Sequence, residues 1–207
     1  MKVKINPYLS VIKMSALNIL MLEVMINGGG SLSKELKLWQ AAGSVFAAVA
    51  GSLLHFVYGW SNQSVIAAPF AAVNESTWEH MKLLFFPMFV FAFIEYLFIG
   101  RKYENFFVSK LAGIILGLVL IPVLYYTCIG AFGNAPGWYN ISIFLLAVAA
   151  AFLLETRLMS RKPVSRIWNV VAVVILCLIA SAFVILTFVQ PKIPLFEDPV
   201  GSFYGIK

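Results

Sequence analysis

Long apolar runs separated by short polar links dominate this chain. At about 1.5 Å of helix rise per residue, about 20 apolar residues cross a hydrocarbon core of about 30 Å. The pattern therefore predicts an all-α fold, a polytopic transmembrane helix bundle. Pro87 and Pro122 fall inside the second and third spans, where each is expected to kink its helix. The five predicted spans cover residues 38–60, 76–100, 111–131, 139–154 and 167–189.

A further apolar stretch, residues 8–26, precedes these spans. It carries Lys13, Asn18 and Glu23, it is long for the apolar region of a signal peptide, and no good cleavage site follows it. We therefore expect it to be retained, either as a sixth N-terminal span or as an interfacial helix. Residues 1–37 then form an N-terminal hydrophobic segment and linker, residues 38–190 the bundle, and residues 191–207 a C-terminal cap.

Composition supports a membrane protein. The chain has 207 residues, of which 61% are hydrophobic and 12% charged, with a mean hydropathy of +0.91. The formal net charge of +6 does not indicate nucleic-acid binding, because the basic residues lie in the links between apolar runs, where insertion topology explains them. We expect membrane lipid, and no nucleic acid, to be in contact with the chain.

The basic links fix the predicted orientation. Three alternate links carry most of the positive charge, which places them on the cytoplasmic side by the positive-inside rule. The end of the first span, the segment 74–80, the uncharged link 132–138 and the C-terminal tail then lie together on the extracytoplasmic side. The residues that carry this argument are Lys34, Lys37, Arg101, Lys102, Lys110, Arg157, Arg161, Lys162 and Arg166.

Small residues recur along the first span. Gly43, Ala47 and Gly51 stand four positions apart and form a smooth stripe on one helix face. Such a stripe favours close packing of another helix of the same chain. The alternative is a docking face for a partner membrane subunit or for a second copy of the chain.

The most polar stretch in the chain, Asn74–Lys82, runs directly into the second span. It holds two carboxylates and one of the only two histidines. His55, at the outer end of the first span, is expected on the same side of the membrane. Imidazole and carboxylate ligands favour zinc, manganese or iron, so we predict a divalent-metal site formed by His55, Glu75 and His80.

Glu79 has two interpretations. As a carboxylate beside a metal-bound water it would be the catalytic general base. Alternatively, Ser76-Thr77-Trp78-Glu79 is a capping box at a helix start, and Glu79 can also pair with Lys82 three positions on. No zinc-protease motif accompanies the cluster, so its chemistry stays open.

Other side chains are expected near this cluster. The tail contains Asp198-Pro199-Val200-Gly201, which predicts a type I turn, and we expect it to fold back over the bundle. Asp198 would then approach the cluster and, with Trp78, Tyr125 and Tyr126, bind substrate. Glu95 lies near the other end of the second span, where we expect it to pair with Arg101 or Lys102 at the membrane edge.

Three motifs resemble those of a known family. They are Leu54-His55-Phe56-Val57-Tyr58-Gly59-Trp60, Val73-Asn74-Glu75-Ser76-Thr77-Trp78-Glu79-His80 and, in the tail, Pro194-Leu195-Phe196-Glu197-Asp198-Pro199. The resemblance is to small bacterial polytopic membrane proteins of unknown function that carry an Asn-Glu-Ser-x-Trp-Glu-His motif. It covers about residue 38 to the C-terminus. It implies a bacterial cytoplasmic membrane and no particular activity.

Two functions therefore remain in view. The first is a metal-dependent membrane hydrolase with an extracytoplasmic His/Glu site and a lipid or small molecule as substrate. The alternative is a non-enzymatic subunit that binds or transports a solute or a cation. A structural membrane protein whose polar cluster only caps a helix is a third interpretation.

Overall fold

The computed structural model describes residues 33–206, which fold into five long helices and two short 3-10 turns. The long helices have 22 to 27 residues each, and the described residues contain no named strand. The elements are α2 (Lys34–Trp60), α3 (Thr77–Phe98), η1 (Gly100–Lys102), α4 (Phe106–Phe132), α5 (Gly137–Met159), α6 (Arg166–Phe188) and η2 (Pro194–Phe196).

Local sequence signals explain several helix ends. Ser33 caps α2 by accepting a hydrogen bond from the Leu36 N–H, and Ser76 caps α3 in the same way through the Glu79 N–H. α4 ends at Phe132 and is capped by Gly133, which adopts a left-handed conformation with φ of 74°. Pro87 and Pro122 lie inside α3 and α4, and both helices continue past them.

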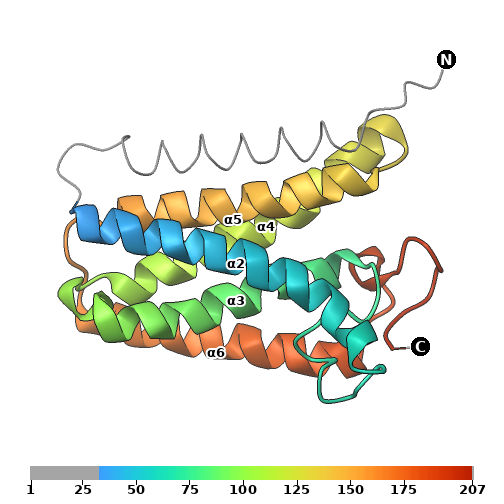
Figure 1. Ribbon diagram of the computed structural model, residues 1–207, viewed down its shortest axis with the longest axis horizontal. Coiled ribbons are helices and arrows are strands. Elements are labelled where there is room, and N and C mark those ends of the chain that lie inside the picture. The colour runs from blue at the N-terminus through green and yellow to red at the C-terminus, as the bar shows by residue number, and fades with distance from the viewer. Residues whose placement is uncertain (1–32, 207) are drawn as a thin grey trace.

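The five helices run side by side along the long axis of the molecule (Figure 1). α3 packs against each of the other four, while α5 packs along α4 and also contacts α2. The core between them is aromatic and aliphatic, and includes Phe85, Phe91, Phe152 and Phe183. α3 is therefore the central helix.

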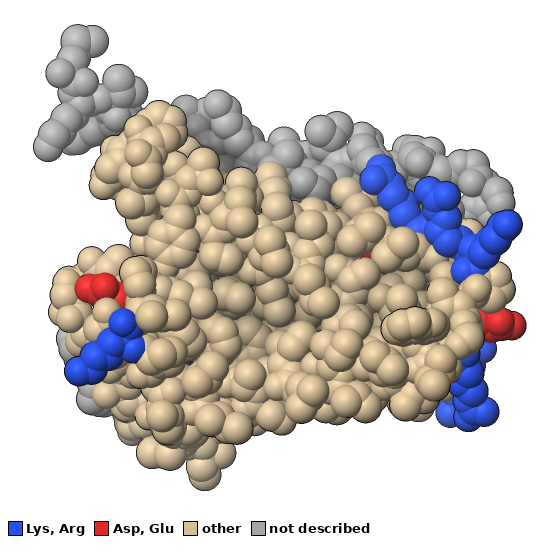
Figure 2. Space-filling view, turned by 180° about the vertical axis from the view of Figure 1, so that it is seen from behind, with Lys and Arg blue, Asp and Glu red and all other residues tan. Residues whose placement is uncertain are grey.

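All five helices are long and apolar enough to cross a membrane. At about 1.5 Å per residue they are about 33 to 40 Å long, which exceeds a hydrocarbon core of about 30 Å. In the view from behind, lysine and arginine gather mainly at one end, and a broad belt with almost no charge lies between the two ends (Figure 2). The chain is a multi-pass membrane protein whose apolar helix faces contact lipid.

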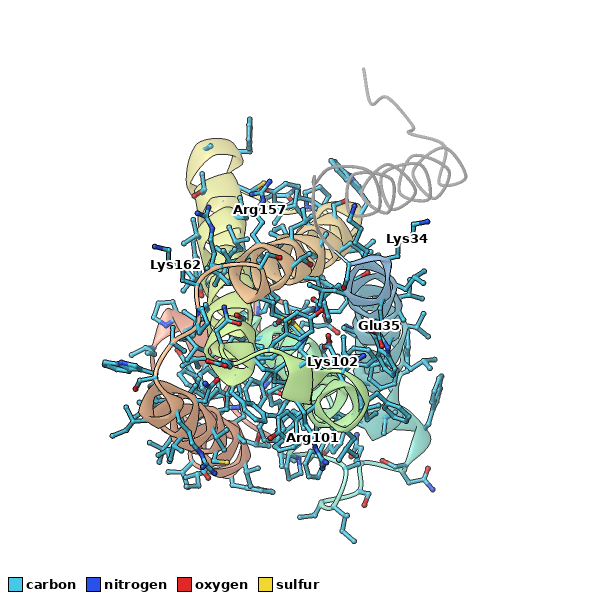
Figure 3. All side chains as sticks on the ribbon, turned by 90° about the vertical axis from the view of Figure 1, so that its left-hand side faces the viewer. Lys34, Glu35, Arg101, Lys102, Arg157 and Lys162 are labelled. Atoms are coloured by element: carbon cyan, nitrogen blue, oxygen red, sulfur yellow. The ribbon has the colours of Figure 1, made fainter. Side chains whose placement is uncertain are left out.

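The basic end of the bundle is formed by the start of α2, by η1 and by the link after α5. Lys34, Arg101, Lys102, Arg157 and Lys162 all lie at this end (Figure 3). Lys102 pairs with Glu35, with Nζ to Oε2 at 2.7 Å, and both side chains are exposed. The C-terminal tail lies at the opposite end (Figure 1).

Three of the predicted span boundaries differ clearly from the helix ends. α2 begins at Lys34, not at residue 38, α4 begins at Phe106, not at residue 111, and α5 continues to Met159, beyond residue 154. The last two errors came from assigning Lys110 and Glu155 to polar links. Both are buried inside helices, where the ion pair between them, Nζ to Oε2 at 2.6 Å, offsets part of the cost of burying their charges.

The predicted pairing of Glu95 was also wrong. Its carboxylate is fully buried and contacts Lys110, with Nζ to Oε2 at 2.5 Å, instead of Arg101 or Lys102. The reason is tertiary: packing of α4 on α3 brings Lys110 to Glu95. Lys102 is occupied by Glu35, and Arg101 lies over the Tyr96 ring.

The small-residue stripe of α2 packs against other helices of the same chain. A Cβ at Gly51 would lie 2.5 Å from the Leu83 carbonyl oxygen and 2.5 Å from Phe144, and one at Gly43 would clash with Phe91. Ala47 is fully buried. These three residues therefore pack α2 onto α3 and α5, as the intramolecular interpretation predicts.

Gly51 and Gly59 provide a matched test of this packing. We expect Gly51→Ala to lower the free energy of unfolding by about 1 to 3 kcal/mol, because the backbone of α3 blocks the added methyl group. Gly59→Ala meets nothing within 4 Å, and alanine is the better helix former, so it should change stability little or raise it by up to about 1 kcal/mol. Unfolding in detergent followed by circular dichroism measures both; equal effects would contradict the packing argument.

Candidate functional site

The segment before α3 is held by its own polar side chains. Ser76 N–H donates to Asn74 Oδ1 at 2.9 Å, and Asn74 Nδ2 donates to the Gly205 carbonyl at 3.0 Å. Ser76 Oγ then accepts the Glu79 N–H. These bonds fix the chain as it enters α3 and so set the position of Glu75.

The tail supports the same segment from outside. Asp198 is buried, and its Oδ1 accepts the N–H groups of Val200 and Gly201 at 2.7 and 3.0 Å. The Ser202 N–H donates to the Asp198 carbonyl, which closes the turn one residue later than a type I turn does. Asp198 Oδ2 accepts the Glu75 N–H at 3.4 Å. The tail thereby holds the backbone of Glu75 in place.

Three side chains of the types that ligate metals meet at the end of the bundle where the tail lies. Glu75 Oε2 lies 3.4 Å from His55 Nε2 and 3.6 Å from His80 Nε2, and one ligand atom from each residue falls within 4.8 Å of the others. They come from α2, from the loop before α3, and from α3. The structure thus brings together the three residues that the sequence singled out as ligands, which we call the His/Glu cluster.

The electrostatics of the cluster favour an ionised carboxylate. A hydrogen bond from His55 holds the pKa of the Glu75 carboxyl below its ordinary value, against the opposing effect of burial. His80 Nδ1 lies 2.9 Å from the Ser76 carbonyl oxygen. A carbonyl only accepts, so Nδ1 carries a proton, and in the neutral ring Nε2 then presents a lone pair toward Glu75.

The cluster borders a cavity of about 330 Å³ between α2 and α5. Leu83, Phe56, Ile141 and Phe144 give it apolar walls, while His55, Glu75 and His80 line it as polar groups. With 31%, 48% and 20% of their side chains exposed, these three are reachable from outside the protein. The cavity can therefore admit a molecule with an apolar part.

A smaller recess of about 20 Å³ adjoins Glu75 and His80, with room for about one water molecule. Tyr125 and Asn140 complete it. Asn140 Oδ1 is buried and has no hydrogen-bond partner. A buried amide oxygen of this kind is an acceptor available to a ligand or a water.

Glu79 lies apart from the His/Glu cluster. It is fully buried, and its Oε2 is 2.6 Å from Lys82 Nζ and accepts the Val73 N–H at 3.0 Å. Its Oε1 accepts from Gln190 Nε2 at 3.3 Å. Only half of the expected capping box forms, because the Ser76 N–H bonds to Asn74 instead of to Glu79. The expected pairing with Lys82 is present.

The residues expected to bind substrate occupy different places. Tyr125 lines the small recess, and Tyr126 lies edge-on beside it with an exposed side chain. Trp78 packs against Phe183 of α6 and Phe196 of the tail, with ring centroids 4.5 and 4.6 Å away. Asp198 serves the turn of the tail and the backbone of Glu75.

Sequence reasoning missed two residues that shape this end, Gln190 and Asn140, and the wider contacts of Lys82. Lys82 Nζ also donates to the Ala68 carbonyl and to Thr187 Oγ1, both at 2.9 Å, so it joins the loop before α3 to α6. Gln190 links Glu79 to the Gly205 N–H of the tail. Asn140 faces the cluster from α5. Only Lys82 carried a signal, its position three residues after Glu79.

The Glu79–Lys82 pair predicts a large loss of stability on Glu79→Gln. The substitution leaves the Lys82 ammonium buried without its counterion, which costs about 3 to 5 kcal/mol of the free energy of unfolding. Glu35→Gln breaks an exposed pair with Lys102 and should cost less than about 1 kcal/mol. Unfolding of both variants in detergent, followed by circular dichroism, tests the difference; a small loss for Glu79→Gln would show that Lys82 finds another partner.

Comparisons with known proteins identify a family and no function. No curated protein and no solved structure matches the chain. The model of a family described only as "Family of unknown function (DUF6512)" matches residues 31–206, which include α2 to α6, the His/Glu cluster and the tail. The match extends a few residues before the start of the resemblance noted in the sequence. The chain belongs to this family of unknown function.

Proposed function

We propose that the His/Glu cluster binds one divalent metal ion and that the protein uses it on a substrate entering the adjoining cavity. One observation carries the proposal. The Nε2 atoms of two histidines from separate helices face the same oxygen of Glu75, at 3.4 and 3.6 Å. An ion between these three atoms would replace the contacts among them with three coordinate bonds.

The ligand set favours zinc, with manganese or iron as alternatives. Two neutral imidazoles and one carboxylate are the protein ligands of several catalytic zinc sites, in which a fourth position stays open for water or substrate. The hydrogen bond from His80 Nδ1 to the Ser76 carbonyl supports this assignment, because it leaves Nε2 free to coordinate.

Hydrolysis is the reaction class that this arrangement supports best. A zinc-bound water has a pKa of about 7, so it can supply hydroxide at neutral pH without a separate base. The proposal leaves Glu79 out of the chemistry, since Lys82, Val73 and Gln190 already occupy its carboxylate. Asn140 Oδ1 and Tyr125 would contact the bound water or the polar part of the substrate.

The substrate would be amphipathic. The cavity walls are largely apolar. They include Phe56 of α2 and Ile141 of α5, whose side chains are exposed on the outside of the bundle. A lipid or another molecule with an acyl or isoprenoid chain could therefore enter from the membrane with its polar group toward the metal. We place the His/Glu cluster on the extracytoplasmic side of a bacterial cytoplasmic membrane, because most of the exposed basic residues lie at the other end.

One observation favours the alternative, a non-enzymatic cation-binding or transport subunit. Glu75 is the one carboxylate that lines the cavity or the recess in the part of the chain that the structure describes. A site that only captures a cation needs no second acid or base, whereas many hydrolases use one.

Metal content tests the shared part of both functions. Protein purified in detergent and incubated with Zn²⁺ should retain about one zinc per chain, because three ligands converge, and elemental analysis measures it. His55→Ala, His80→Ala and Glu75→Gln should each weaken zinc binding at least about tenfold. Glu197→Gln is the matched control, since its carboxylate lies at the same end but bonds to Tyr204, and it should keep the metal. Equal zinc binding by all four variants would refute the site.

Activity separates the two functions. A hydrolase loaded with zinc should release fatty acid from vesicles of phospholipid or of another acyl ester. In His80→Ala this activity should fall at least about a hundredfold while the helix content is unchanged. A transport subunit should instead carry Zn²⁺ into proteoliposomes without cleaving lipid. Cleavage that persists in His80→Ala would contradict the metal mechanism.

A further inference from the structure

A second polar cluster lies at the other end of α3, inside the bundle. Lys110 Nζ of α4 stands 2.5 Å from Glu95 Oε2 of α3 and 2.6 Å from Glu155 Oε2 of α5. Gln40 Nε2 of α2 donates to Glu95 Oε1 at 2.6 Å. We call Gln40, Glu95, Lys110 and Glu155 the buried tetrad. It joins four of the five helices at one point.

The tetrad is sealed from solvent. Gln40, Glu95 and Glu155 have no exposed surface, and Lys110 is 1% exposed. The rings of Phe91, Phe106 and Phe152 lie around the ammonium group, with centroids 5.1 to 5.9 Å from Nζ. In such surroundings an uncompensated charge costs several kcal/mol, so the tetrad should be neutral.

Its side chains are not neutral as they stand. Two carboxylates face one ammonium, and Gln40 is uncharged, which leaves one excess negative charge. Three buried oxygens of the tetrad also accept no hydrogen bond: Gln40 Oε1, Glu155 Oε1 and Glu95 Oε2, of which only Glu95 Oε2 has an ion-pair partner, Lys110. The excess charge and the free oxygens point to one further positive ligand.

The geometry around Glu155 favours a proton over a metal cation. Lys110 already lies within 2.6 Å of both carboxylates and would repel a second cation beside them. Gly113 of α4 lies against the Glu155 side chain: a Cβ added at Gly113 would clash with Glu155 Cγ and lie 2.7 Å from Glu155 Oε1. This side has no room for an ion and its oxygen ligands, whereas a proton needs none.

We propose that the buried tetrad is an exchangeable proton-binding site, with the proton on the Glu155 carboxyl. Proton uptake converts the Glu155 carboxylate to a carboxylic acid and makes the tetrad neutral; release returns it to a single negative charge. The charged groups that face Glu155 are Lys110 from α4 and, across it, Glu95 from α3, while α2 contributes the uncharged Gln40.

Exchange would take place through the basic end of the bundle. Glu95, Lys110 and Glu155 each lie about one helical turn, or about 6 Å, from an end of α3, α4 or α5. The buried side chains of Ile99, Phe106 and Met159 pack together at those ends, and the exposed Arg101 and Lys102 and the link after α5 lie beyond them (Figure 3). Proton exchange therefore requires this apolar layer to open. The site is independent of the His/Glu cluster, which lies at the opposite end of α3.

Infrared spectroscopy of the full chain in lipid tests the proposal, because a carboxylic acid absorbs separately from a carboxylate. At neutral pH the wild type should show one buried acid band that disappears reversibly as the pH is raised. The number of bound protons should equal the number of glutamates minus the number of lysines in the tetrad. Glu155→Gln and Glu95→Gln should therefore each remove the band, and Lys110→Met should double it.

Glu35→Gln is the matched control, because Glu35 pairs with Lys102 in an exposed position and its loss should leave the band unchanged. Glu155→Gln makes the tetrad neutral and is expected to fold, so the test does not depend on Lys110→Met. Circular dichroism checks the helix content of each variant. A band that survives in both glutamine variants would overturn the proposal.

Two other results would also overturn it. A band that stays constant at every pH at which the protein is folded would mean a locked, non-exchanging proton. The second result is absence of the band together with a midpoint of thermal unfolding that rises in NaCl but not in choline chloride. If Glu155→Gln lost this response to Na⁺, the site would belong to a metal cation instead.

Discussion

Neutralisation of buried charge is the constraint on which the described fold depends. Lys82 and Lys110 are both buried at the ends of a membrane-spanning bundle, and each lies within 2.6 Å of at least one carboxylate. In a medium of low dielectric constant, these groups are tolerated only together. Lys110 pairs with carboxylates of two other helices, and the Glu79–Lys82 pair of α3 bonds to the preceding loop and to α6, so each network also fixes how those elements meet. The two polar networks therefore act as anchors, one at each end of an apolar core.

The anchor around Lys82 has a consequence for the His/Glu cluster. Lys82 bonds to Glu79, to the loop at Ala68 and to Thr187 of α6, and Glu79 in turn binds Val73 and Gln190. The loop before α3 is thereby held on several sides, with Asp198 of the tail on the outside. A loop held in this way presents Glu75 in a fixed place between two histidines. The rigidity that a metal site requires thus comes from residues that never touch the ligand.

α3 connects the two polar networks. It carries Glu79, His80 and Lys82 near its start and Glu95 in its last turn, and its middle packs through Leu84, Phe85 and Phe91 against the rest of the core. The proposed metal site and the proposed proton site are therefore attached to opposite ends of one central helix, with apolar packing between them. A change in charge at either end acts on an element that contacts every other long helix that the structure describes.

The amino-acid sequence determined the helical class, the five spans and the distribution of basic residues, because these follow from the local run of apolar and charged side chains. It also located His55, Glu75 and His80, since histidine and glutamate stand out in so apolar a chain. The spacing of Glu79 and Lys82 already indicated their ion pair within α3. Only the tertiary structure decided the pairing of the other buried charges: Glu95 bonds to Lys110 instead of to its neighbours in sequence. It also decided that Val73 and Gln190 complete the surroundings of Glu79, away from the cluster. Glu95, Lys110 and Glu155 come from three different helices, so their pairing depends on how the helices pack and has no signature in sequence spacing.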